Sequence, residues 1–378
     1  MYAEEVSNIH EDKLALRVRQ RSYWKKDRAM SIDLFTPVVS ESAQHPNFRN
    51  IHKQPNGFNC DVLNDWARGF HDRDGKFVRE FQTTFDSSFW ELYLFAVLKH
   101  LRLDVDFSVS SPDFYVTNMG GVNIEATVAS HALGATPEFM KDDAEAPKDL
   151  NEFNRQTILR IRNSLDTKRN KYQDRYSSLS HVKNRPFVLA VTTFDRPFAQ
   201  LTCQRAIEAA LHGYYVDEER FLRDGGALKG YQITAVTKDN QSDVPVGIFS
   251  SQDFAWLSAV VFSSCATWGK VRALSSDPNP NILFQAVRLN SNGVAPHVVR
   301  ANKSRYVESL LDGLSVYHNP LATHKLSLEM FRHNDVFQSF YSEEEQDWVY
   351  EHRDGLLVWR SVLTRIATSA RAGTKDNK

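Results

Sequence analysis

The sequence has few cysteines and no long apolar run, and these two absences exclude several classes of protein. Its 378 residues include 3 cysteines, Cys60, Cys203 and Cys265, which lie far apart. An odd number of scattered cysteines argues against a disulfide framework or a cysteine-based zinc site and fits a reducing cytoplasm. No run of about 18 apolar residues occurs, so we expect no membrane-spanning helix and no membrane partner.

The chain also has a net charge close to zero and no phosphate-binding loop motif. The formal net charge is -1, so a nucleic-acid-binding surface would have to be local. One basic segment, residues 17–28, includes Tyr23 and Trp24. It is either a nucleic-acid contact with stacking aromatics or a solvated face. The 13 histidines show no zinc spacing, and no Gly-x-x-x-x-Gly-Lys-Ser/Thr loop occurs, so the chain is not itself a P-loop motor.

What the sequence does contain is an alternation of helix and strand patterns between residues 81 and 215. Helical spacing of apolar residues predicts helices over 86–101 and 151–176, with a further helix over 202–212. Strands are predicted over 104–109, on both sides of a turn within 111–130, and over the continuous apolar run 186–194. Residues 131–149 are polar and indicate a long loop or flap.

The flanking regions give weaker signals. A short helix is predicted near 60–70. Beyond residue 215, we predict strands over 254–263 and 282–289 and helices over 306–314 and 343–367. This C-terminal part would either extend the first sheet or form a separate α/β lobe. The predicted domains are an N-terminal extension (1–80), a core (81–215) and a C-terminal extension (216–378).

The most informative feature is a predicted β-hairpin that carries two acids. Asp113 lies near the start of its first strand, and Glu125 lies in the middle of its second. A carboxylate in an otherwise apolar strand is costly unless it is paired or binds a cation. Mg²⁺ is usually held by one or two carboxylates plus water and phosphate oxygens, so the pair suggests a hard-metal site. In the alternative, Asp113 caps a nearby backbone and Glu125 pairs with an arginine such as Arg160 or Arg162.

Hairpin geometry decides whether the two acids can converge. Side chains alternate along a strand, and directly opposed residues share one side of the sheet. Asp113 and Glu125 therefore meet only if an odd number of residues connects the paired positions, as with a three- or five-residue connection. Gly120 or Gly121 would supply the left-handed residue that such a connection needs.

The order of helix, strand, hairpin, helix and strand resembles the PD-(D/E)xK (restriction-endonuclease-like) nuclease superfamily. The resemblance rests on Pro112-Asp113, on Ile124-Glu125-Ala126-Thr127 and on Glu91 in the first helix. It implies an α/β fold whose mixed sheet has an αβββαβ core. It also implies that Asp113 and Glu125 bind Mg²⁺ or Mn²⁺, with Glu91 completing or orienting the metal shell.

The chain departs from this superfamily two residues after Glu125, where Thr127 stands in place of lysine. In some members the lysine has migrated to the following helix, and here Lys168 and Lys171 are the candidates for that role. Lys168 lies near the apolar stripe of its helix, and Lys171 lies further round. Each could instead be an ordinary helix lysine whose stem covers the sheet.

The expected function is therefore metal-dependent hydrolysis of phosphodiester bonds, with DNA favoured as the substrate. Bacterial genome defence or DNA processing is the setting that the resemblance implies. A homodimer or a separate ATP-driven protein would fit as partner, and the cytoplasm as location. The alternative is a catalytically inactive module of the same fold that binds nucleic acid or assembles a complex.

Overall fold

The computed structural model describes residues 32–54, 56–224, 230–290 and 296–365. The basic segment 17–28 lies outside these residues. The α-helices in the described ranges are α2 (Pro46–His52), α3 (Phe58–Ala67), α4 (Phe77–Thr83), α5 (Phe85–His100), α6 (Leu150–Asp174), α7 (Arg205–His212), α8 (Glu218–Asp224) and α9 (Trp268–Leu274). Short 3₁₀ helices occupy several connections, including Glu138–Asp143 in the predicted flap.

A seven-stranded mixed sheet forms the centre of the molecule, in the order β1-β2-β3-β8-β11-β12-β13. Its strands are β1 (Phe114–Val116), β2 (Val122–Ser130), β3 (Phe187–Phe194), β8 (Ala259–Phe262), β11 (Leu314–His318), β12 (Val336–Ser342) and β13 (Asp347–Glu351). Strands β2, β3 and β8 run parallel, whereas β1 pairs antiparallel with β2 at one edge. The short edge strand β1 therefore lies beside the longest strand of the parallel set.

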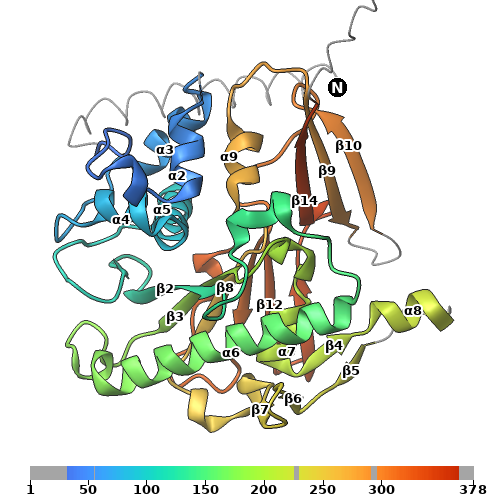
Figure 1. The fold of residues 1–378 in the computed structure, drawn as a ribbon. Helices are drawn as coiled ribbons and strands as arrows, with labels where there is room; N and C mark the ends of the chain where they lie inside the picture. The colour runs from blue at the N-terminus through green and yellow to red at the C-terminus, as the bar shows by residue number, and fades with distance from the viewer. Residues whose placement is uncertain (1–31, 55, 225–229, 291–295, 366–378) are drawn as a thin grey trace, which may run out of the picture.

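Helices cover both faces of this sheet (Figure 1). On one face, α3, α4 and α5 pack around alternate residues of the strands, such as Ile124, Val188 and Val261. On the other face, α6 and α7 cover the intervening residues, such as Leu189 and Val260. Strand β3 is buried along its whole length, as its continuous apolar run predicts.

Smaller sheets complete the C-terminal half. Strands β9 (Ile282–Leu289), β10 (His297–Asn302) and β14 (Leu356–Thr364) form an antiparallel sheet in the order β10-β9-β14, which projects beside α9 in Figure 1. Two further antiparallel pairs join β4 (Tyr214–Val216) to β5 (Gly230–Gln232) and β6 (Ala235–Thr237) to β7 (Asp243–Pro245). The large sheet continues beyond residue 215 through β8, β11, β12 and β13. The predicted domain boundaries stay predictions.

Most predicted elements of the central region are confirmed. Helices α3, α5, α6 and α7 and strands β3 and β9 lie where the sequence predicts them, with ends that differ by a few residues at most. The prediction of a mixed α/β fold is likewise confirmed. The predicted strand over 254–263 is shorter, because a 3₁₀ helix (Gln252–Phe254) precedes β8.

Two predicted C-terminal helices are wrong. Residues 306–314 are irregular up to Leu314, where β11 begins. Tyr306 turns inward to stack on Phe284, with ring centroids 4.2 Å apart, and this tertiary contact overrides the local helical pattern. Residues 343–367 contain β13 and β14, separated by a turn in which Gly355 has φ 83°. Pairing with β12 and β9 decides their conformation.

The predicted strand over 104–109 is reduced to a single bridge between Val105 and Val116. Asp106 explains why the pairing stops, because its carboxylate accepts a hydrogen bond from the Ser108 N–H (2.7 Å). Such a local side-chain bond turns the backbone away from a neighbouring strand. From α5 through β3 the chain thus forms a helix (α5), a single bridge, two strands (β1 and β2), a helix (α6) and a strand (β3).

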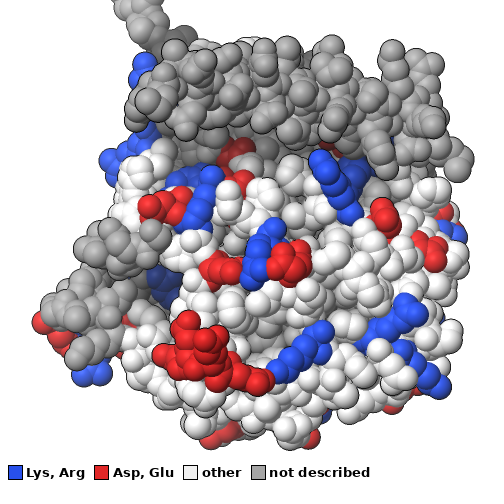
Figure 2. All heavy atoms as spheres, turned by 180° about the vertical axis from the view of Figure 1, so that it is seen from behind, with Lys and Arg blue, Asp and Glu red and all other residues white. Residues whose placement is uncertain are grey.

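Charges of both signs are interspersed on the face opposite the view of Figure 1. Figure 2 shows Lys and Arg side chains separated by acidic ones and by wide uncharged areas among the described residues of that face. This distribution matches the net charge of -1. A continuous basic strip is not seen on the described part of this face.

Candidate functional site

The β1–β2 hairpin places the two predicted acids opposite each other. Its register pairs Phe114 with Ile124 and Val116 with Val122, so one further step along the ladder sets Asp113 against Glu125. A five-residue connection, 117–121, separates the paired ends. This is one of the connection lengths that the convergence of the acids requires. Within that connection, Gly120 and Gly121 have φ 85° and 81°, respectively, as the turn demands.

Glu125 is the most buried member of the site, with a side chain that is 1% exposed. Its Oε1 accepts hydrogen bonds from Lys168 Nζ (2.6 Å) and Lys171 Nζ (2.8 Å), and its Oε2 accepts one from the Tyr176 hydroxyl (2.9 Å). Burial acts to raise the pKa of Glu125, but the two lysines outweigh burial and hold the pKa below its usual range. The carboxylate is therefore ionised at neutral pH.

Helix α6 supplies both lysines because its packing face lies over β2. The helix begins at Leu150, where the Asp149 carboxylate accepts a hydrogen bond from the Glu152 N–H (2.7 Å) as an N-cap. Lys168 is 17% exposed and Lys171 is 40% exposed, so Lys168 is the more enclosed of the two. Three residues of spacing bring both ammonium groups to one side of the helix.

The backbone of Ala126 links Asp113 to Lys168. Asp113 Oδ2 accepts a hydrogen bond from the Ala126 N–H (2.7 Å), and the Ala126 carbonyl accepts one from Lys168 Nζ (3.1 Å). Arg73 fixes the approach to Asp113 by donating to the carbonyls of Val109 (2.9 Å) and Pro112 (3.2 Å). Asp113 and Lys168 thus both bond to the backbone of a single residue of β2, Ala126.

Glu91 belongs to α5, which packs on the face of the sheet opposite α6, and its carboxylate interacts with that of Asp113. Burial, and then the charge of Asp113, raise the pKa of Glu91 to about 8. Burial, and then the charge of Glu125, raise the pKa of Asp113 to about 6. Mutual repulsion among these carboxylates means that the Glu91 and Asp113 side of the site is short of positive charge.

The residues expected in the site thus gather around the β1–β2 hairpin. Asp113, Glu125, Lys168 and Lys171 are joined through hydrogen bonds to Glu125 and Ala126, and Glu91 interacts electrostatically with Asp113. Within the described residues, however, no group of three or more His, Cys, Asp or Glu side chains is placed to hold one metal ion. The three acids do not form a preassembled cage.

Of the alternative interpretation, the structure shows the part in which Asp113 caps a nearby backbone, at the Ala126 N–H, but Glu125 pairs with lysines and not with an arginine. Arg162 instead donates to the Pro245 carbonyl (2.9 Å) and pairs with Asp166 (3.0 Å). Thr127 lies two residues beyond Glu125 and on the same side of β2, where a lysine would stand in the superfamily pattern. Lys168 comes to this side from α6.

Sequence reasoning missed two contributors to the site. Tyr176, at the end of the predicted helix 151–176, continues its apolar stripe in the sequence, yet its hydroxyl bonds to Glu125. Burial, and then the charge of Glu125, raise the pKa of Tyr176, so the hydroxyl stays protonated and donates. A tyrosine at the end of an apolar stripe offers a polar tip, and that was the available signal. Nothing in the sequence indicates the role of Arg73, because it depends on a loop that returns 36 residues later.

The raised pKa of Glu91 predicts a pH dependence of stability. Between pH about 4.5 and about 8 the folded protein keeps a proton on Glu91 that the unfolded chain has released. The free energy of unfolding should therefore fall as pH rises through this window. Glu91→Gln should flatten that fall and raise stability at pH 8. Urea unfolding at a series of pH values, in EDTA, measures both effects.

The groups whose charges act on Glu91 are Asp113, Arg73, Glu80 and Glu125. Only Arg73 opposes the rise, so the direction of the prediction is fixed by burial and by three acids. Glu344→Gln changes an exposed acid between β12 and β13 and serves as the matched control. Parallel stability curves for the Glu91→Gln and wild-type proteins would contradict the assignment.

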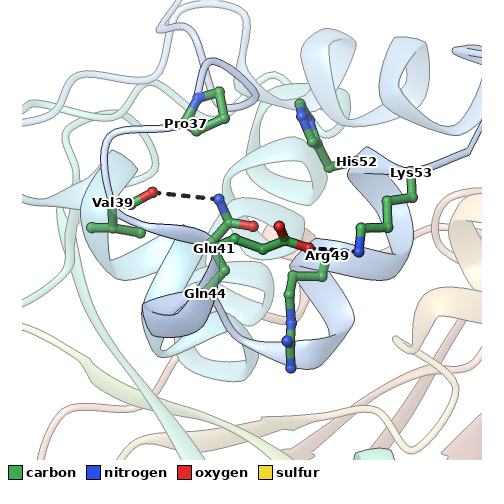
Figure 3. A pocket seen from close by; sticks show the side chains of 7 residues that line it. All are labelled: Pro37, Val39, Glu41, Gln44, Arg49, His52 and Lys53. Carbon is green, nitrogen blue, oxygen red and sulfur yellow. Dashed lines mark hydrogen bonds and ion pairs between the residues drawn. The ribbon is translucent and has the colours of Figure 1, made fainter.

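A surface hollow lies elsewhere, on the N-terminal helices. Figure 3 shows the side chains around it, from Pro37 to Lys53, in and beside α2. The Lys53–Glu41 ion pair (2.6 Å) crosses it, and Arg49 and His52 lie beside that pair. None of the five candidate site residues lines this hollow.

Comparisons with protein-family models, with curated proteins and with solved structures find no match for this chain. None of the helices in the described ranges has the length and apolar character that crossing a bilayer requires. Residue chemistry and geometry therefore carry the functional argument.

Proposed function

We propose that the chain is a metal-dependent nuclease of the PD-(D/E)xK superfamily, which hydrolyses phosphodiester bonds of nucleic acid. The observation that carries this proposal is the position of Lys168. Its ammonium group lies 2.6 Å from Glu125 Oε1 and 3.1 Å from the Ala126 carbonyl. A lysine from the following helix thus reaches the acid pair, which is the arrangement expected if the lysine absent at Thr127 has migrated.

The donor set suits Mg²⁺ or Mn²⁺. Mg²⁺ needs only one or two carboxylates, because water and phosphate oxygens supply the rest of its shell. Asp113 and Glu125 are the proposed ligands, with Glu91 completing or orienting the shell. Asp113 and Glu91 repel each other, and a divalent cation would relieve that repulsion.

The two lysines of the site then have different roles. Lys168 positions the attacking water or a phosphate oxygen, because its ammonium group can donate up to three hydrogen bonds. Lys171, which is more exposed, adds positive charge beside Glu125. Bound Mg²⁺ would lower the pKa of a coordinated water and stabilise the charge that grows on the phosphate.

The architecture supports the proposal in coarse outline. Helix α5, strands β1 and β2, helix α6 and strand β3 follow the expected αβββαβ order, except that a single bridge replaces the first strand. DNA is the favoured substrate, and genome defence or DNA processing in the cytoplasm is the proposed setting. Dimerisation, or an ATP-driven partner protein, would belong to the same proposal.

A second candidate is an inactive module of this fold, which binds nucleic acid without cutting it. The observation that favours it is that both oxygens of Glu125 already accept hydrogen bonds, from two lysines and Tyr176. A carboxylate offers about four acceptor positions, and three are used here. Metal binding at Glu125 would therefore have to use the remaining position or displace a lysine.

A cleavage assay decides between the two candidates. We expect the wild-type protein to cut plasmid DNA, single-stranded DNA or RNA with Mg²⁺ or Mn²⁺, and EDTA to abolish cleavage because the chain itself supplies no substitute for the metal. Readdition of the metal should restore activity. Cleavage that persists in EDTA would reject the metal-dependent site, and binding without cleavage under either metal would favour the inactive module.

A further inference from the structure

One side of the hairpin carries a second row of side chains next to the acids. Strand pairing sets Tyr115 against Asn123, two residues along each strand from the Asp113 and Glu125 positions. Side chains alternate, so Asp113 and Tyr115 point to the same side of the sheet, separated by ~6.8 Å along the strand. The apolar neighbours Phe114 and Val116 point into the core on the opposite face. Tyr115 therefore extends the site along the sheet edge.

Arg185 is held over this row by aromatic and hydrogen-bond contacts. Its guanidinium lies over the Tyr115 ring, 5.3 Å from the centroid, and its Nη1 donates to the Tyr115 hydroxyl. A Cβ at Gly121 would collide with this guanidinium, so the turn leaves the space that Arg185 occupies. A planar guanidinium that stacks on an aromatic ring is pre-organised, and fewer degrees of freedom are lost when it binds an anion.

The backbone around Arg185 is anchored to the same row. Asn123 Nδ2 donates to the His181 carbonyl (2.9 Å), and the His181 ring bonds through Nε2 to the Ser111 carbonyl (2.8 Å). The Asn123 N–H donates to the Pro186 carbonyl (3.0 Å). The segment that carries Arg185 is thus fastened to both strands of the hairpin beside the acids.

Within the described part of the chain, no carboxylate lies within ion-pair distance of Arg185. Its hydrogen-bond partner there, Tyr115, is neutral, and the guanidinium has five N–H donors in all. The stretch 168–185 around it is strongly basic in a chain of net charge -1, with one acid, Asp174, against Lys168, Arg169, Lys171, Arg175, Lys183 and Arg185. An uncompensated, pre-organised guanidinium in such a segment suits a phosphate group.

We propose that Arg185, held by Tyr115, binds the phosphate next to the one that is cleaved. This inference rests on the proposed nuclease function for its substrate class, a nucleic-acid strand that follows the β1 edge. Asp113 and Tyr115 lie ~6.8 Å apart along the β-strand. Neighbouring phosphates of one nucleic-acid strand are separated by a similar distance. Contact with the backbone positions the strand and reads no sequence.

The test measures binding and cleavage separately. A fluorescein-labelled DNA oligonucleotide, single-stranded and as a duplex, is titrated by fluorescence anisotropy over a range of salt concentrations. The protein carries Asp113→Asn, so binding is followed without cleavage. Adding Arg185→Ala should weaken binding roughly tenfold. It should also reduce the slope of log affinity against log salt concentration by about 1. In the otherwise wild-type protein, Arg185→Ala should raise KM and leave kcat nearly unchanged.

Two variants separate a phosphate contact from a structural brace. Tyr115→Phe keeps the ring and removes the hydroxyl that orients the guanidinium, so it should weaken binding less than Arg185→Ala does. Arg300→Ala removes an exposed arginine of β10 and should leave binding and its salt slope unchanged. Arg185→Ala should keep the thermal unfolding midpoint of its parent if its role lies in binding.

The outcomes distinguish this inference from the function on which it rests. If the wild-type protein cleaves and Arg185→Ala leaves KM and the salt slope unchanged, the phosphate contact is wrong and the nuclease proposal stands. If Arg185→Ala weakens binding in a protein that never cleaves, the contact stands and the nuclease proposal fails. A protein that neither binds nor cleaves the oligonucleotides overturns both.

Discussion

Asp113→Asn is expected to abolish cleavage and to make the protein more stable. If Asp113 holds the proposed metal ion, losing its charge removes several kcal/mol of transition-state stabilisation, which corresponds to a rate loss of about 10³-fold or more. Burial and the charge of Glu125 raise the pKa of Asp113 to about 6, so the fold disfavours its ionised form. Asparagine keeps an acceptor for the Ala126 N–H and carries no charge. At pH 8 we therefore expect stability to rise by on the order of 1–2 kcal/mol.

Opposite changes in activity and stability are characteristic of a functional site, and they make this variant informative. Steady-state cleavage and urea unfolding at pH 8, both on the same preparation, provide the two measurements. In EDTA the stabilisation should fade toward pH 4, where the wild-type Asp113 is protonated as well. Loss of activity together with loss of stability would point instead to a structural role for Asp113.

Glu125→Gln provides the contrast, because the two acids have different surroundings. Glu125 is paired with Lys168 and Lys171, and removing its charge leaves both ammonium groups without their acid. Breaking a buried ion pair costs about 3–5 kcal/mol, and the partial exposure of Lys171 reduces that cost. We expect Glu125→Gln to lose cleavage and to be destabilised. Equal stability changes in the two variants would contradict the geometry described for this site.

The central elements could be predicted from the sequence because their patterns are local. The apolar run of β3 and the helical spacing of α5 and α6 each lie within one segment, so burial follows from composition and period. The hairpin could be predicted because its turn glycines and its parity rule are also local. Whether the acids on adjacent strands oppose each other depended on the length of the turn, which the sequence left open and which is five residues in the structure.

The rest depends on contacts between distant segments. Strands β13 and β14 carry a pattern that also fits a helix, and pairing with β12 and β9 determines their conformation. The bond from Tyr176 to Glu125 spans 51 residues, and the bond from Arg185 to Tyr115 spans 70. Neither partner can be identified before the sheet order is known. The sequence indicates Lys168 as a candidate, because a lysine near an apolar stripe needs a partner or a snorkelling stem.

Lys168→Ala is expected to reduce cleavage by about 10²–10³-fold, whereas Lys171→Ala should cost less than about tenfold. Both lysines bond to Glu125 Oε1, at 2.6 and 2.8 Å, so both variants weaken the same ion-pair cluster. Lys168 differs because it also bonds to the Ala126 carbonyl and is the less exposed of the two. Lys171→Ala is therefore a matched control for the loss of one positive charge beside Glu125.

Moving the lysine back to the strand tests its role directly. Thr127 lies two residues after Glu125 on the same side of β2, so Thr127→Lys places a second ammonium group near the position that Lys168 occupies. In the Lys168→Ala background, Thr127→Lys should recover at least tenfold of the lost rate in single-turnover cleavage. The same change should give no recovery in the Asp113→Asn protein, because charge near Glu125 does not replace the metal-binding acid. If Lys168→Ala and Lys171→Ala are equally active, or if Thr127→Lys restores nothing, Lys168 does not position the water or the phosphate, and its bond to Glu125 only balances a buried charge.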